Sequence, residues 1–138
     1  MDAKVVWKGN QSFEGTPGSG FPVWMDTSEE YGGLNNGIRP MEMILVGMGG
    51  CTAMDVVPIL KKKKQDVKAF EIRLHGDRAT EHPHVFTEIT LEYVVTGHNI
   101  DPEAVRRAIE LSETKYCSVS AMIQKSAKVT TRFTILEG

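Results

Sequence analysis

Five segments of the chain have hydrophobic patterns typical of half-buried strands. They are residues 3–9, 21–25, 67–76, 85–96 and 129–136. Glycines and prolines separate the first two segments, and turn-forming residues at 77–83 lie between the third and the fourth. We therefore expect short antiparallel strands near the N-terminus, a central hairpin and a closing strand.

The longest segment of helical periodicity begins at Pro40, a residue that the first turn of a helix tolerates. Apolar positions recur there at spacings typical of a helix: Met41, Ile44, Leu45, Met48, Cys51, Thr52 and Ile59. Gly47, Gly49 and Gly50 would each weaken an exposed helix by about 1 kcal/mol relative to alanine. We therefore expect a central helix with Cys51 on its buried stripe, approached closely by another backbone or a ligand.

Two further helices are expected in the second half of the chain. The Asp-Pro-Glu sequence at 101–103 is typical of a helix start, and this helix is expected to end near Thr114. Residues 118–125 have the pattern of one more short helix. Strands and helices thus occur in groups, which predicts an α+β fold with a mainly antiparallel sheet and a single domain over residues 1–138.

Composition and charge narrow the classes of function. The chain has 41% hydrophobic and 25% charged residues and a formal net charge of -2, so we expect no nucleic-acid partner. Residues 1–8 lack the charged and apolar regions of a secretory signal, and no stretch is expected to match the roughly 18 apolar residues of a membrane span. The sequence therefore predicts a cytoplasmic protein with no membrane partner, in which thiols are kept reduced.

The two cysteines are the candidate chemical groups. Cys51 and Cys117 are 66 positions apart (117 − 51) and lack the CxxC spacing of a zinc or thioredoxin site, but a reversible redox role stays open. A helix that opens at Ser118 would favour a thiolate at Cys117. The alternative for both cysteines is a small buried hydrophobe.

Other groups have plainer interpretations. Three histidines, His75, His82 and His84, lie around the predicted turn without further ligands, so we expect no metal site. The methionines are expected to fill the core, although a methionine-rich lining would also suit an apolar ligand.

Four segments resemble a known family. Residues 39–57, RPMEMILVGMGGCTAMDVV, resemble the cysteine-bearing helix of the OsmC-like branch of the OsmC and organic-hydroperoxide-resistance superfamily. Residues 116–121, YCSVSA, resemble the segment that carries the second cysteine of this family, with Ser118 where many members have proline. Residues 81–86 and 93–97 resemble its hairpin.

The resemblance implies a fold, a reaction and a partner. Members of the family form intertwined α+β homodimers with long central helices. A peroxidatic cysteine reduces organic hydroperoxides, a resolving cysteine closes a disulfide, and an external dithiol of the lipoyl type restores the thiols without a bound cofactor. Carried onto this chain, Cys51 is expected to be peroxidatic and Cys117 resolving, in oxidative-stress defence. Hydrogen peroxide is a further candidate substrate.

The activating residues are a separate expectation. In the family an arginine held by a glutamate lies well upstream of the cysteine helix. The first arginine here, Arg39, lies 12 positions before Cys51 (51 − 39), so Arg39 and Glu42 are the candidates for this role. An ion pair at the helix start is the alternative interpretation of these two residues.

Two alternatives to the peroxidase remain at this point. The first is a dimeric binding protein of the same fold that takes small apolar ligands. The second is a cysteine hydrolase, which would need a histidine base that the sequence does not pair with either cysteine.

Overall fold

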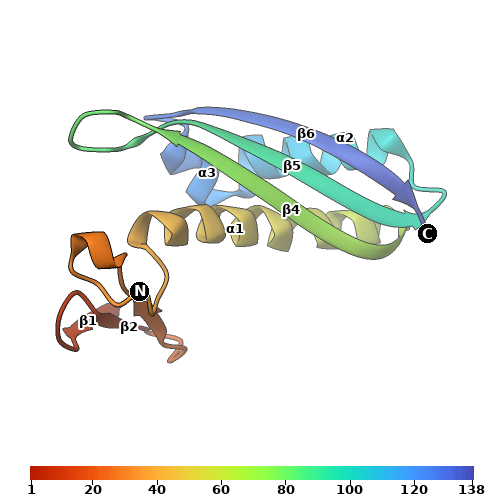
Figure 1. The fold of residues 1–138 in the computed structure, drawn as a ribbon. Coiled ribbons are helices and arrows are strands. Elements are labelled where there is room, and N and C mark those ends of the chain that lie inside the picture. Colours follow the sequence, from red (N-terminus) through yellow and green to blue (C-terminus); the bar gives the residue numbers. More distant parts are fainter. The chain divides into compact units, whose positions relative to one another are not determined.

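The computed structural model describes residues 1–138, which form two compact units, Met1–Ile44 and Leu45–Gly138 (Figure 1). The first unit holds one sheet and a short 3₁₀ helix. The second unit holds another sheet and three helical segments. The single domain over residues 1–138 stays a prediction.

The first unit is a three-stranded antiparallel sheet in the order β1-β2-β3. Its elements are β1 (Ala3–Trp7), β2 (Phe13–Pro17), β3 (Val23–Met25) and η1 (Glu29–Tyr31). The middle strand, β2, is an addition to the elements predicted from the sequence. It carries Gly15 and ends at Pro17, two residues that favour turns and so conceal the strand.

Helix α1 (Pro40–Lys62) confirms the long helix expected from the sequence. Its start is capped, because the Glu42 carboxylate accepts a hydrogen bond from the backbone N–H of Arg39 at 2.8 Å. Five residues of the helix are buried: Met48, Gly49, Thr52, Val56 and Leu60. Thr52 therefore lies on the buried stripe, and Cys51 lies at its half-buried margin rather than on it, contrary to expectation.

The second sheet has the order β4-β5-β6. Its strands are β4 (Asp66–Arg78), β5 (Phe86–His98) and β6 (Lys128–Glu137). Strands β4 and β5 form the predicted antiparallel hairpin, but β5 and β6 are parallel. A parallel pair requires a crossover, which is supplied by α2 (Pro102–Leu111), the π-helical turn η2 (Ser112–Tyr116) and α3 (Ser118–Ile123).

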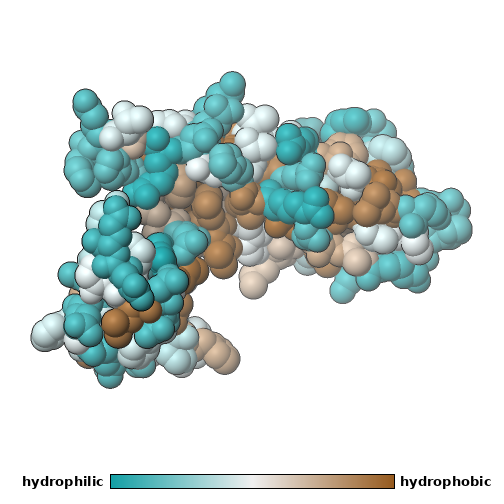
Figure 2. All heavy atoms as spheres, viewed as in Figure 1, coloured by the Kyte–Doolittle hydropathy of each residue, from teal (hydrophilic) through white to brown (hydrophobic).

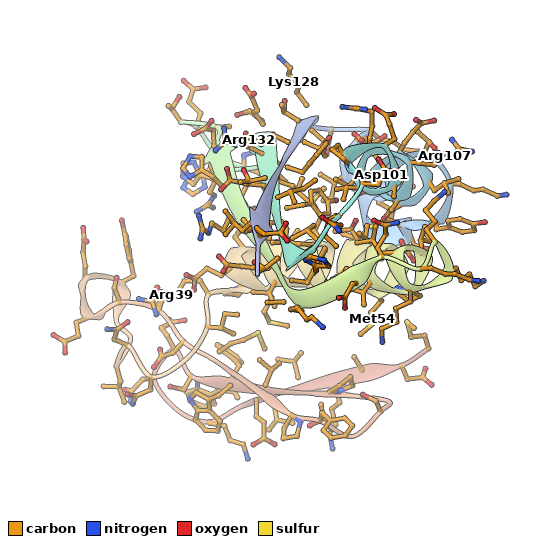
Figure 3. The ribbon with its side chains drawn as sticks, turned by 90° about the vertical axis from the view of Figure 1, so that its right-hand side faces the viewer. Arg39, Met54, Asp101, Arg107, Lys128 and Arg132 are labelled. Carbon is orange, nitrogen blue, oxygen red and sulfur yellow. The ribbon has the colours of Figure 1, made fainter.

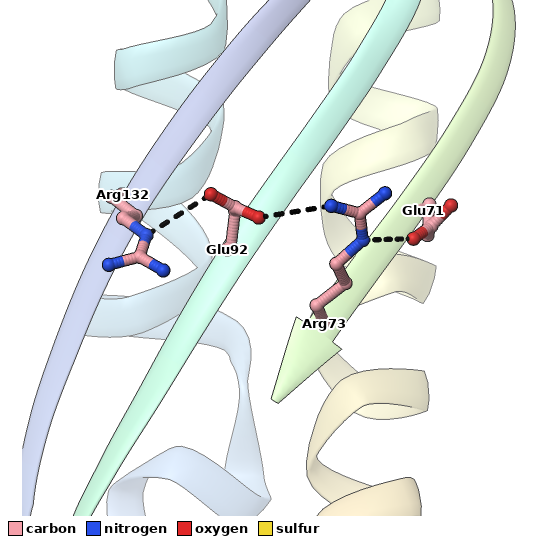
Figure 4. Close-up of polar contacts among 4 residues, drawn as sticks. All are labelled: Glu71, Arg73, Glu92 and Arg132. Carbon is pink, nitrogen blue, oxygen red and sulfur yellow. Dashed lines mark hydrogen bonds and ion pairs between the residues drawn. The ribbon is translucent and has the colours of Figure 1, made fainter. Parts of the chain in front are cut away.

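The two faces of the second sheet differ in polarity. Along β5 the side chains of Ile89, Leu91 and Tyr93 are almost completely buried on the face that the helices cover (Figure 1). The opposite face carries a ladder of ion pairs that joins the three strands, Glu71–Arg73–Glu92–Arg132 (Figure 4). The core of the second unit therefore lies between its sheet and its helices.

Helix α1 is strongly apolar although little of it is buried. An 18-residue window of this helix has mean hydropathy 1.8, yet only 28% of the window is buried. By length and composition it meets the criterion for a membrane span, contrary to the expectation from the sequence. The charged residues of α1 lie mostly near its ends, and its glycines and alanine do not lower the mean hydropathy of the window much. Figure 2 shows hydrophobic atoms along the band where α1 and β4 lie.

These elements confirm the α+β class, with three antiparallel strand pairs, one parallel pair and a long cysteine-bearing helix. The intertwined homodimer stays a prediction.

Candidate functional site

The two cysteines come from different elements of the second unit, and both are free thiols. Cys51 lies in the middle of α1 and is half-buried, whereas Cys117 is 2% exposed at the junction of η2 and α3. The two thiols are near neighbours, because Cys51 is among the groups that raise the pKa of the Cys117 thiol. The fold therefore brings together the two cysteines that the sequence singles out.

The surroundings of Cys117 favour its neutral form. Burial raises the pKa of the Cys117 thiol, and the neighbouring Cys51 thiol raises it further. Hydrogen bonds from Ser120 act in the opposite direction; its backbone N–H donates to Cys117 Sγ at 3.4 Å. Cys117 itself is thus the N-cap of α3, but burial outweighs the capping effect that was expected to favour a thiolate.

A buried chain of hydroxyl groups lies next to the cysteine pair. Thr52 Oγ1 lies 2.8 Å from the Tyr93 hydroxyl and 2.7 Å from Ser112 Oγ, and Ser112 Oγ donates to Asp55 Oδ2 at 2.9 Å. Thr52 and Asp55 come from α1, Tyr93 from β5 and Ser112 from η2. This network ties the Cys51 helix both to the sheet and to the segment that precedes Cys117.

Tyr93 is the member of this network with the strongest electrostatic perturbation. Burial raises the pKa of its phenol to about 12; the hydrogen bond with Thr52 partly opposes this, and Glu113, Cys117 and Asp55 add to it. The phenol therefore stays protonated at any physiological pH and keeps its hydrogen to donate.

This network was not predicted from the sequence. The only signal in the sequence is the pair Thr52 and Asp55, two polar residues three positions apart on an otherwise apolar helix. Their partner Ser112 is 60 residues beyond Thr52, and a single sequence gives no means of pairing them. The Asp55 carboxylate in this network accepts its hydrogen bond from Ser112.

Arg39 and Glu42 lie in the first unit, at the start of α1. The Arg39 guanidinium donates to Gly37 O at 3.0 Å and to Asn35 Oδ1 at 2.6 Å, while Glu42 caps the helix through the Arg39 backbone. The two side chains therefore form no direct ion pair with each other, and their role as an activating couple stays a prediction. Both serve the local structure of the helix start.

The arginines of the second unit are all engaged away from the cysteines. Four of them pair with glutamates: Arg73, Arg106, Arg107 and Arg132. The fifth, Arg78, donates to the His84 carbonyl at 2.9 Å. Figure 3 shows Arg107 and Arg132 pointing outward from this unit. Within one chain, no guanidinium of this unit is hydrogen-bonded to Cys51.

An open apolar hollow of about 330 Å³ lies against the helix that carries Cys51. Its lining residues come from α1 and β4: Val46, Gly49, Gly50, Ala53, Phe70, Ile72 and Leu74. Cys51 is not among these residues, and on a regular helix its side chain points to another side of α1 than those of Val46 and Ala53. No group of three or more histidine, cysteine or acidic side chains is arranged to hold a metal ion.

The fold and the neighbouring thiols define a small α+β dithiol protein, and comparisons with known proteins identify its family. The family model described as OsmC-like protein matches residues 33–132. Protein YhfA of Escherichia coli strain K12 is 40% identical over 136 residues, which cover 99% of this chain and 98% of that protein. The chain therefore belongs to the OsmC-like protein family.

Solved structures agree with this assignment. A hypothetical protein from Aquifex aeolicus VF5 is 31% identical with a TM-score of 0.87, covering 99% of this chain and 96% of the other. The organic hydroperoxide resistance protein OhrB of Bacillus subtilis has a TM-score of 0.65 at 17% identity, covering 97% and 98% of the two chains. At that identity, the second comparison shows a common fold alone.

Proposed function

We propose that the protein is a thiol-dependent peroxidase that reduces organic hydroperoxides to alcohols, with Cys51 as the peroxidatic and Cys117 as the resolving cysteine. The observation that carries this proposal is the pair of neighbouring thiols with unequal exposure. The half-buried thiol of Cys51 is the more accessible of the two, whereas the neutral and buried Cys117 is suited to react only with its neighbour.

The proposed reaction has two chemical steps. The Cys51 thiolate attacks a peroxide oxygen: an S–O bond forms, the O–O bond breaks, and the alcohol leaves after taking up a proton, so that Cys51 becomes a sulfenic acid. Cys117 sulfur then attacks Cys51 sulfur: the S–S bond forms, the S–O bond breaks, and the leaving hydroxide takes the Cys117 proton to form water.

An external dithiol completes the proposed cycle. Two exchange steps transfer the disulfide to this reductant, which leaves oxidised while both protein thiols are restored. A lipoyl-type dithiol fits this role, and no bound cofactor is needed. Such a cycle suits the reducing cytoplasm, which is the compartment that we propose. Solved relatives named organic hydroperoxide resistance proteins support the class of substrate.

We also propose that the protein is a homodimer through α1. Val46 and Met54 are 64% and 79% exposed on this helix, and a Cβ added at Gly47 or Gly50 would meet nothing within 4 Å. Of the three glycines expected to allow a close approach, only Gly49 meets a neighbour in the same chain, at 2.9 Å from Leu74. A second copy is the occupant that would use the open space at the other two.

The test is lipoamide-coupled reduction of cumene hydroperoxide by the purified protein. Cys51→Ser should abolish both turnover and sulfenic acid formation, because the attacking sulfur is gone. Cys117→Ser should still form a Cys51 sulfenic acid, detected by dimedone labelling and mass spectrometry, but no intramolecular disulfide. Wild-type turnover that survives Cys51→Ser would rule out this proposal.

A second candidate function is a dimeric binding protein for small apolar ligands with weak or no peroxidase activity. Two observations favour it: the five arginines of the second unit are engaged elsewhere, which leaves Cys51 without an arginine in its own unit, and α1 carries an apolar hollow on another side. Two free thiols after a stoichiometric peroxide pulse, together with a co-purifying apolar molecule, would favour this function over the peroxidase.

A further inference from the structure

Ser112 makes two kinds of contact that together connect the cysteines. Its hydroxyl is bonded to Thr52 and Asp55 of α1, at 2.7 Å and 2.9 Å. Its carbonyl accepts a hydrogen bond from the backbone N–H of Cys117 at 2.8 Å. Thr52 is the residue directly after Cys51, so Ser112 is bonded to the neighbour of one cysteine and to the backbone of the other.

The hydroxyl bonds have a definite direction. Ser112 uses its single hydrogen to donate to the Asp55 carboxylate, so it must accept from Thr52. Thr52 has then used its own hydrogen and must accept from Tyr93, whose phenol remains protonated. Each hydroxyl group of this network therefore donates its hydrogen to one particular partner. This restricts the side-chain rotation of Ser112 and Thr52.

The backbone bond belongs to a rare type of turn. Residues Ser112–Tyr116 form a π-helical turn, in which Cys117 N–H reaches back five residues to the Ser112 carbonyl. Such turns are rare and tend to occur at functional sites. Here the turn determines where Cys117 lies, and Ser112 is the fixed end of it. Ser112 is completely buried, so water does not compete for these contacts.

We propose that Ser112 is a positioning residue that holds Cys117 against Cys51 and thereby favours closure of their disulfide. The inference rests on the proposed function, because it takes Cys117 as the resolving partner of Cys51. Ser112 touches neither the substrate nor the reacting sulfurs. It acts through the backbone of Cys117 and through the helix that carries Cys51.

The test measures how readily the disulfide closes, without any peroxide. The full-length protein is equilibrated with mixtures of oxidised and reduced lipoamide, and after acid quenching and alkylation the ratio of disulfide to dithiol is measured by mass spectrometry. Ser112→Ala should lower the equilibrium constant for closure about ten-fold, because small errors in placement strongly lower the effective concentration of two reacting groups. Ser112→Thr keeps a hydroxyl and should stay within about two-fold of wild type.

The matched control is Tyr93→Phe, which also removes one buried hydroxyl contact of Thr52 but none of those made by Ser112. It should lower the melting temperature while changing the closure constant by less than about two-fold. Where Ser112→Ala does not fold, Asp55→Asn weakens the same contact by removing its charge and should shift closure in the same direction.

The outcomes separate this inference from the peroxidase proposal. A closure constant for Ser112→Ala equal to or above that of wild type would overturn the positioning role, even in an active peroxidase. An equal loss in Tyr93→Phe would do the same, because it would indicate general loosening. Absence of peroxide turnover in a wild-type protein that closes its disulfide normally would overturn the peroxidase alone.

Discussion

At the scale of single residues, exposure and hydrogen bonding give the two cysteines different chemistry. Cys117 combines nearly complete burial with a raised pKa, and this favours the thiol. Cys51 lies at the margin of the buried stripe and is half-buried, so it is the more accessible of the two thiols. A peroxide-reducing pair needs this asymmetry, because the first cysteine must meet the substrate and the second must meet only the first.

In the first unit, the buried carboxylate of Asp26 is held by several hydrogen bonds. It is 2% exposed, and its carboxylate accepts hydrogen bonds from Ser12 Oγ and from the backbone N–H groups of Thr27, Leu34 and Asn36. Burial alone would raise its pKa, but the hydrogen bonds from Thr27, Asn36, Leu34 and Ser12 together lower it below the ordinary value. The ionised form therefore organises the loop between β3 and α1.

We predict that Asp26 makes the first unit sensitive to acid. Because its pKa is lowered on folding, its contribution to stability is present above the unfolded value of about 3.9 and is lost as the pH falls through the lower folded value. Asp26→Asn should destabilise the protein at neutral pH, and the difference from wild type should shrink at lower pH. Urea unfolding across pH 2–7 measures this. A difference that is constant over this range would contradict the prediction.

At the scale of elements, the sequence predicts those with strong periodicity and misses those defined by distant contacts. Helix α1 and the β4–β5 hairpin have clear patterns and were predicted. The parallel pairing of β6 was not, because an alternating strand pattern does not state the direction of its neighbour. The same holds for the site: both cysteines were predicted, but Ser112 was not, since its role depends on a partner 60 residues away.

The loop between β3 and α1 supplies a prediction about glycine. A Cβ at Gly33 would lie 2.1 Å from the Thr27 carbonyl oxygen and 2.7 Å from Asp26 Oδ1, so backbone must move to make room. Gly33→Ala should therefore destabilise the protein by about 1–3 kcal/mol. The control is Gly18→Ala, whose Cβ would lie 3.5 Å from the nearest atom and should change stability by less than about 0.5 kcal/mol. Equal melting temperatures of the two variants would contradict this explanation.

At the scale of the whole molecule, the main question is what covers α1. The helix has the hydropathy of a membrane span but little burial within one chain, and Met54 is exposed on it (Figure 3). Water is a poor solvent for such a surface, and patches of this kind mark interaction sites. The glycines without a neighbour allow another backbone to approach. A second α1 fits both requirements, since it offers the same small and apolar residues.

The double variant Val46→Glu and Met54→Glu tests this arrangement. Two carboxylates on an apolar interface would be desolvated without partners, so the variant should sediment as a monomer, or unfold at a lower temperature, whereas wild type is expected to sediment as a dimer. Met122→Glu is the control, because Met122 is 65% exposed, similar to Val46 at 64%, but belongs to α3 rather than to α1. It should remain dimeric. A wild-type protein that sediments as a monomer at all concentrations would contradict the proposed dimer, and dissociation by Met122→Glu would move the interface from α1 to α3.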